Sequence, residues 1–186
     1  MIIEGDGIRL RPLQKSDIEL KVKWFNDPVV NKTIIIEESL ELEKSLIWFD
    51  SIASDDNRRD FVIETVDGKS IGITGLLGIN RKLEYAECFC VIGEKSFWGK
   101  GIGTLDHSLL LQYAFEKLEL NKIWAVIYTD NTAIFRIVEK LGSKIEGTLR
   151  EEKTIDGKKI DLYRIGVLKR EFTPTHKTCK FIPDDQ

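Results

Sequence analysis

The stretch FWGKGIGT at residues 97–104 places three glycines at alternate positions, Gly99, Gly101 and Gly103. It leads directly into LDHSLLLQYAFEKL at residues 105–118, an apolar run of helical length. Glycine has no Cβ and lets a ligand approach the backbone closely, and the first N–H groups of a helix have no partner within that helix. The stretch therefore predicts a tight turn into a helix, at which backbone donors are free to bind a ligand.

Two common phosphate-loop patterns do not fit this stretch. The nucleoside-triphosphate loop needs a glycine five residues before the glycine of its Gly-Lys-Ser/Thr end, where this chain has Glu94. The dinucleotide fingerprint needs a third glycine five places after Gly99, where this chain has Thr104. A third arrangement does fit, in which successive backbone N–H groups point into one concavity that the helix start continues.

A helix start of this kind carries about half a positive elementary charge and favours a diphosphate. Lys100 adds a full positive charge beside it. From the spacing alone, glycines that merely make a tight strand-to-helix turn are an equally good interpretation.

The segments around this stretch alternate between strand and helix patterns. Apolar alternation or continuous apolar runs predict strands at 8–12, 61–65, 70–74, 84–92, 122–128, 144–149 and 158–168. Helices are predicted from Ser16 to the Asp27-Pro28 pair, over 39–53, from the glycine stretch to about Leu118, and from Asn131 to a cap at Gly142. Asp67-Gly68 and Asp156-Gly157 are hairpin signals. This order predicts one mixed α/β domain.

The composition is that of an ordinary globular protein. The 186 residues fit one domain, and 42% are hydrophobic and 32% charged. No apolar run reaches the roughly 18 residues that cross a bilayer, and the N-terminus lacks a signal-peptide pattern, so a cytoplasmic location is expected. The net charge of −3 gives no reason to expect nucleic acid as a partner. The tail after Glu171 has two prolines and mixed charge, and we expect it to be a loosely held extension.

The three cysteines, Cys88, Cys90 and Cys179, predict neither a disulfide framework nor a metal site. Cys88 and Cys90 would point the same way from a strand, but the two histidines, His107 and His176, lack ligand spacing, so packing is the expected role. Asp106 and His107 open the long helix and are expected to be solvated or to bond locally.

With its surroundings, the glycine stretch resembles the GNAT-type N-acyltransferases, and most closely the branch of ribosomal-protein and diamine acetyltransferases. The resemblance runs from about residue 7 to residue 172. It rests on LRPL at 10–13, Trp24, NDP at 26–28, AE at 86–87, IGEK at 92–95, FWGKGIGT at 97–104, YAF at 113–115, Asn131, EKLG at 139–142 and EGTLRE at 146–151. It implies a single acyltransferase domain at 1–172, with a mixed, mostly antiparallel sheet and helices on both faces, followed by an extension at 173–186.

The resemblance also implies acetyl-CoA as cosubstrate, without a metal. The family's pyrophosphate loop maps onto Trp98, Gly99, Lys100, Gly101, Ile102, Gly103 and Thr104, with Trp98 in place of the usual leading polar residue. The strand before the loop splays from its neighbour in this family and binds the pantetheine arm, which implicates Cys90, Val91 and Ile92. Asn131 matches a position near the thioester end of the cofactor.

Glu87 is the candidate general base. An acceptor amine with a pKa of about 10.4 is protonated at pH 7, and removing its proton costs about 4.6 kcal/mol. Glu87 shares a strand face with Phe89 and Val91, where related enzymes carry a glutamate; a simple ion pair with a basic residue is the alternative. Many relatives have a tyrosine, which protonates the leaving thiolate, where this chain has Val138. Tyr128 and Tyr113 are more readily explained as packing residues.

The sequence thus predicts an N-acetyltransferase that acts on a primary amine by direct attack in a ternary complex. The acceptor is a peptide or protein amine, a polyamine, an amino sugar or an aminoglycoside, selected around Trp24, Phe25 and Asn26 and near Asp156. The aromatic residues there either stack on the acceptor or fill the core. A non-catalytic acyl-CoA-binding domain and a nucleotide-binding module remain alternatives, and a homodimer is an assembly common in the family.

Overall fold

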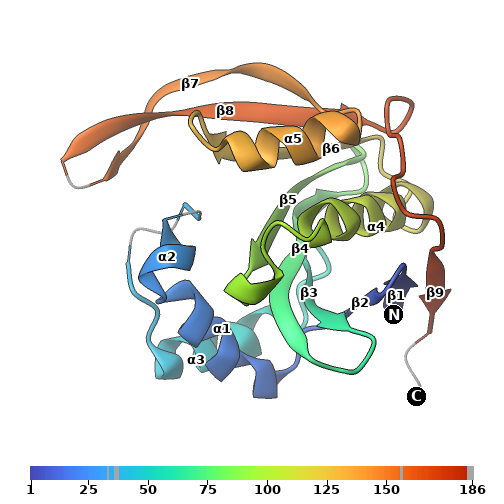
Figure 1. Cartoon of the computed structure of the whole chain (residues 1–186), viewed down its shortest axis with the longest axis horizontal. Helices are drawn as coiled ribbons and strands as arrows, with labels where there is room; N and C mark the ends of the chain where they lie inside the picture. Colours follow the sequence, from blue (N-terminus) through green and yellow to red (C-terminus); the bar gives the residue numbers. More distant parts are fainter. Residues whose placement is uncertain (33, 36–37, 156, 184–186) are drawn as a thin grey trace.

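The computed structural model describes residues 1–32, 34–35, 38–155 and 157–183. A nine-stranded sheet runs through this part of the chain in the order β7-β8-β6-β5-β4-β3-β2-β1-β9 (Figure 1). The strands are β1 (Ile2–Gly5), β2 (Ile8–Pro12), β3 (Arg59–Thr65), β4 (Ser70–Asn80), β5 (Tyr85–Ile92), β6 (Lys122–Tyr128), β7 (Lys144–Ile155), β8 (Lys158–Leu168) and β9 (Lys180–Ile182). The helices are α1 (Ile18–Phe25), α2 (Pro28–Asn31), α3 (Leu42–Ile52), α4 (Ile102–Glu116) and α5 (Thr132–Lys140), with 3-10 turns η1 (Lys15–Asp17) and η2 (Lys95–Phe97).

The predicted mixed, mostly antiparallel sheet is confirmed. Every neighbouring pair of strands in the described sheet is antiparallel except β5 and β6, which are parallel and are connected through α4. A parallel pair needs such a crossover because the chain must return to the same end of the sheet.

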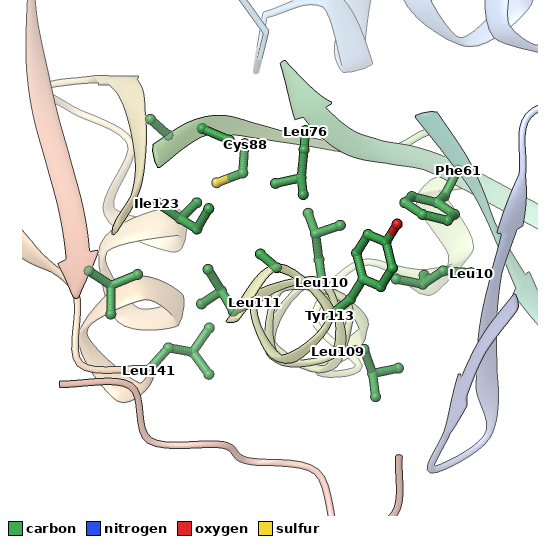
Figure 2. Packing of buried hydrophobic residues seen from close by; sticks show 14 of the residues in the cluster. Leu10, Phe61, Leu76, Cys88, Leu109, Leu110, Leu111, Tyr113, Ile123 and Leu141 are labelled. Carbon is green, nitrogen blue, oxygen red and sulfur yellow. The ribbon is translucent and has the colours of Figure 1, made fainter. Parts of the chain in front are cut away.

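Helices cover both faces of the sheet, as predicted, and each face has its own core (Figure 1). On one face, α4 is apolar on nearly all sides and packs against strand residues that include Leu76, Cys88 and Ile123 (Figure 2). On the other face, α1 contributes Trp24 and Phe25 to a smaller cluster.

Several element boundaries differ from the sequence prediction. The first helix ends as predicted, but a short helix α2 follows at once because the Asp27 carboxylate accepts a hydrogen bond from Val29 N at 2.8 Å. The strands β4 and β7 extend beyond their predicted ends at Thr74 and Leu149, and β1 was not predicted. Asp156 of the second hairpin signal lies outside the described residues. None of the helices in the described ranges is long and apolar enough to span a membrane.

The expectation of a loosely held tail is wrong, because β9 pairs with β1 along one edge of the sheet. Asp6 fixes the approach to β9 by accepting hydrogen bonds from Lys177 N at 2.6 Å, Thr178 N at 3.1 Å and Thr178 Oγ1 at 2.8 Å. The hydroxyl of Ser108 on α4 accepts one from Thr175 N at 2.9 Å and lies 2.7 Å from His176 Nδ1. These polar contacts tie the tail to the β1–β2 turn and to α4, and such contacts between distant residues produce no apolar periodicity in the sequence.

Asp6→Asn should loosen β9. Hydrogen bonds, first of all from the Lys177 amide, lower the pKa of Asp6, so its stabilising effect is present above its unfolded pKa and is lost as pH falls through the folded value. We expect the β9 amides of the variant to exchange with solvent faster than those of the wild type at pH 7, and the difference to vanish in acid. Hydrogen-exchange protection factors measure this. Asp67→Asn, in the β3–β4 turn, is the control, and equal β9 protection in the wild type and in Asp6→Asn at pH 7 would contradict the prediction.

Candidate active site

The sheet opens between its two parallel strands. The register pairs of β5 and β6 end at Glu87 with Trp124, whereas β5 stays paired with β4 as far as Ile92 and β6 stays paired with β8 as far as Tyr128. The two strands therefore diverge beyond Glu87 (Figure 1). From Cys88 to Ile92, one edge of β5 has no strand partner within the described residues.

The backbone groups of Cys90 and Ile92 face this gap. Phe89 O accepts a hydrogen bond from Thr74 Oγ1 on β4 at 2.9 Å, and Gly93 N donates to Ile71 O on β4 at 2.9 Å. Because successive amides on a strand point in opposite directions, the groups of Cys90 and Ile92 point away from β4. By the same alternation the Val91 amide faces β4, and its side chain is buried in the smaller core.

The glycine loop leads from this edge into α4. Gly99 and Gly101 have left-handed φ values of +74° and +82°, which explains the need for glycine at both. No side chain caps α4, whose first backbone hydrogen bond runs from Leu105 N to Gly101 O at 3.1 Å. A Cβ built on either glycine would meet no atom within 4 Å, so the free N–H groups of the first turn border open space.

The third glycine has a packing role. A Cβ on Gly103 would lie 3.0 Å from Ile137 Cδ1, so this glycine lets α4 approach α5. Ile102 and Thr104 beside it are partly buried, whereas Lys100 is exposed, with its Nζ 5.3 Å from the centroid of the Phe97 ring. The tight-turn interpretation of the glycine stretch is confirmed by the positive φ of Gly99 and Gly101, whereas phosphate binding stays a prediction.

Trp98, which replaces the family's polar residue, connects the loop to the strand. Its indole Nε1 donates a hydrogen bond to Ile92 O at 2.8 Å, while 38% of its surface is exposed. The backbone oxygen of Ile92, at the end of the free edge of β5, thus already accepts a hydrogen bond.

Trp98→Phe removes this hydrogen bond while keeping an aromatic ring. A neutral hydrogen bond contributes about 1 kcal/mol, so we expect the KM for acetyl-CoA to rise about fivefold. Steady-state kinetics at saturating acceptor measure this. Trp48→Phe on α3 loses an indole N–H far from the loop and is the control; an unchanged KM in Trp98→Phe would show that the bond does not shape the site.

Glu87 lies where the two strands part, half-buried on the face opposite α4. It shares that face with Phe89 and Val91, as predicted, since the alternate residues Cys88 and Cys90 pack towards α4. Burial raises the pKa of Glu87, and the positive charge of Arg164 opposes this rise. The Arg164 guanidinium lies 4.0 Å from the centroid of the Trp124 ring, beside Glu87. Arg164 also lies near a second carboxylate, with its Nε 3.8 Å from Glu146 Oε2, and the role of Glu87 as a base stays a prediction.

Asn131 lies just beyond the far end of β6. Its Oδ1 accepts a hydrogen bond from Ile134 N at 3.2 Å and caps α5. Val138, further along α5, is buried in the core, so no hydroxyl is available there.

The aromatic residues near the predicted acceptor region are packing residues. Trp24 and Phe25 are 3% and 6% exposed, which confirms the core interpretation. Tyr113, far from this region, is buried against Phe61 as expected. Tyr128 is only partly buried, and its hydroxyl donates to Ile34 O at 3.3 Å, so its packing role stays a prediction.

The expected local bond is confirmed for His107, whose Nδ1 lies 3.1 Å from Gly103 O, but the expectation of solvation is wrong for both Asp106 and His107. They are 0% and 7% exposed and lie beneath the loop, beside Cys90 and Thr74. The sequence contained no periodic signal for this cluster, because Thr74 belongs to a strand distant in the sequence.

Residues 8–144 match the family model described as "Acetyltransferase (GNAT) domain". The chain belongs to this family. It is 29% identical to spermidine N(1)-acetyltransferase of Escherichia coli K12 over 172 residues, which cover 92% of this chain and 91% of that protein. It is also 29% identical to the putative ribosomal N-acetyltransferase YdaF of Bacillus subtilis, over 75% of this chain and 84% of that protein.

A solved structure has the same fold. The crystal structure of spermidine N-acetyltransferase from Vibrio cholerae in complex with CoA and spermine superposes with a TM-score of 0.84 and 25% identity, covering 89% of this chain and 97% of that one. The protein is therefore an N-acetyltransferase that uses acetyl-CoA. This confirms the prediction of an enzyme over the alternative of a non-catalytic acyl-CoA-binding domain. Its free helix start and open strand edge fit such a cosubstrate.

Proposed function

We propose that this enzyme transfers the acetyl group directly to a primary amine in a ternary complex. One observation carries the proposal: the free edge of β5 joins the uncapped start of α4 to Glu87, on the opposite face of the sheet. In this assignment the pyrophosphate binds at Trp98, Gly99, Lys100, Gly101, Ile102, Gly103 and Thr104. The pantetheine arm lies along Cys90, Val91 and Ile92, and Asn131, at the start of α5, borders the thioester.

Glu87 acts as the general base in this proposal, directly or through one water. The amine nitrogen attacks the thioester carbon, the carbon–sulfur bond breaks, and the amine proton passes to Glu87. An N–H group on the free edge of β5 stabilises the negative charge that develops on the carbonyl oxygen. Because Val138 has no hydroxyl, the thiolate takes its proton from solvent, which is feasible since a thiol pKa lies near 8.5.

A polyamine is the first acceptor class to test. The support comes from the relatives, whose names include spermidine N(1)-acetyltransferase and a putative ribosomal N-acetyltransferase. Peptide amines, amino sugars and aminoglycosides share the required primary amine and remain within the proposal.

An amine panel tests the function. Thiol release from acetyl-CoA is followed with spermidine, a ribosomal-protein N-terminal peptide, an amino sugar and an aminoglycoside, and CoA binding is measured separately by thermal shift. We expect CoA to raise the melting temperature and one amine class to release thiol well above background. Failure of every amine would overturn the proposed acceptor class, and failure of CoA to bind would overturn the assigned donor site.

A cytoplasmic location and a homodimer complete the proposal. The free cysteines Cys88, Cys90 and Cys179 suit a reducing compartment. The homodimer is proposed because dimers are common in the family, and light scattering on the purified protein tests it.

A further inference from the structure

A polar cluster lies inside the larger core, directly beneath the glycine loop. The Thr74 hydroxyl bridges Phe89 O at 2.9 Å and Asp106 Oδ2 at 3.0 Å. His107 Nδ1 lies 3.1 Å from Gly103 O and 3.5 Å from Asp106 Oδ2. Together these contacts connect β4, β5 and the first turn of α4.

If the cluster had only a structural role, its unpaired buried polar atom would lower the stability of the fold. Thr74 and Asp106 are fully buried, and Asp106 Oδ1 has no hydrogen-bond partner among the described residues. An unpaired buried polar atom costs about 1–3 kcal/mol, and well-packed apolar side chains often serve a core equally well. A role beyond packing would explain why such a cluster occupies this position.

The two backbone oxygens that the cluster contacts, those of Gly103 and Phe89, lie next to the proposed donor site. Gly103 O belongs to the turn that presents the free N–H groups, and Phe89 immediately precedes Cys90 on the free edge of β5. The side chain of Cys90 also lies in the cluster, with its Sγ within 4.8 Å of ligand-type atoms of Asp106 and His107. The two halves of the donor site are thus fixed to one another through Asp106, His107 and Thr74.

We propose that Asp106, His107 and Thr74 are positioning residues that set the spacing between the pyrophosphate loop and the free edge of β5. This inference deepens the proposed function, because it rests on the donor site assigned there. A fixed spacing matters because the cosubstrate must contact both the loop and the strand at once, and binding to a preformed site avoids the cost of ordering it.

The electrostatics of the cluster agree with this role. Burial alone would lower the pKa of His107, but hydrogen bonds with Asp106, Cys88 and Cys90 raise it well above its ordinary value. The groups around His107 thus favour its protonated form, and its Nδ1 lies 3.5 Å from Asp106 Oδ2.

Thr74→Val tests the proposal because it removes the bridging hydroxyl without changing the shape of the side chain. We expect the dissociation constant of CoA, measured by calorimetry without acceptor, to rise about tenfold, together with the KM for acetyl-CoA. The KM for the acceptor should stay within twofold, and Thr74→Ser should restore the wild-type values. Ser108→Ala removes a buried hydroxyl of the same helix whose contacts among the described residues are to Thr175 and His176 of the tail, so it controls for general loss of stability.

If Thr74→Val folds poorly, Asp106→Asn is the second variant. It should also raise the dissociation constant of CoA about tenfold. A fall in melting temperature like that of Ser108→Ala with unchanged CoA affinity would overturn the proposal. One equivalent of zinc in the purified protein that is lost in Cys90→Ser would also overturn it, since Cys90, Asp106 and His107 would then be metal ligands. Absence of CoA binding by the wild type would instead refute the donor site itself.

Discussion

Gly101→Ala is expected to weaken CoA binding about 30-fold. Gly101 precedes α4 with a φ of +82°, and a Cβ there projects into open space rather than against the protein. That space is where the assigned pyrophosphate approaches the free N–H groups, so the methyl group excludes the ligand from its donors. A 30-fold loss corresponds to about 2 kcal/mol, comparable to the loss of one or two charge-assisted hydrogen bonds. Calorimetry with CoA measures it.

Gly68→Ala is a matched control for this effect. Gly68 lies in the β3–β4 turn with a φ of +83°, and a Cβ there also meets no atom within 4 Å. Both variants bear the same backbone strain of about 1–2 kcal/mol, which should lower both melting temperatures. Only Gly101→Ala should lose CoA affinity, and an equal loss in both variants would mean that strain rather than ligand contact is responsible.

Glu87→Gln should lower kcat/KM for the acceptor by about two to three orders of magnitude, the usual contribution of a general base. The wild-type rate should rise with pH through the raised pKa of Glu87, because the base must be ionised. In the variant this limb should disappear, and the rate should follow the ionisation of the free amine alone. Rate profiles over pH at subsaturating acceptor measure both effects.

The affinity of Glu87→Gln for CoA should stay within twofold of the wild-type affinity. This result would show that the substitution affects the chemical step rather than donor binding. Glu116→Gln, at the exposed end of α4, removes a carboxylate away from the site and should leave kcat/KM unchanged. If Glu87→Gln keeps both the wild-type rate and the acidic limb of the profile, Glu87 is only an ion-pair partner and the base lies elsewhere.

Most of the sheet could be predicted because its signals are local. The apolar run at Lys122–Tyr128 and the Asp67-Gly68 turn each determine their element within a few residues. The pairing of β1 with β9 could not be predicted, because three-residue to four-residue strands at opposite ends of the chain carry no periodicity. Their order comes from tertiary contacts such as those of Asp6.

The donor side of the candidate site was visible in the sequence for the same reason. A tight turn at glycines and the alternating faces of a strand are local properties, and Glu87 shares a face with Phe89 and Val91 as predicted. The positive φ of Gly99 and Gly101 became visible only in the structure. The bond from Trp98 to Ile92 O and the burial of Asp106 and His107 depend on how strands and α4 meet in space. Single-sequence patterns do not contain that information.

The parting of β5 from β6 has a mechanical consequence. It divides the strand pairing into two blocks, β9 with β1–β5 and β6–β8, which share three register pairs. The larger core also joins the blocks, because α4 packs against Leu76 and Cys88 of one block and against Ile123 of the other. Because the ladder between the blocks is short, apolar packing on α4 holds them together more than backbone hydrogen bonds do. A donor bound in the gap would contact both blocks at once, and we expect it to slow hydrogen exchange of the β5 and β6 amides beside the gap.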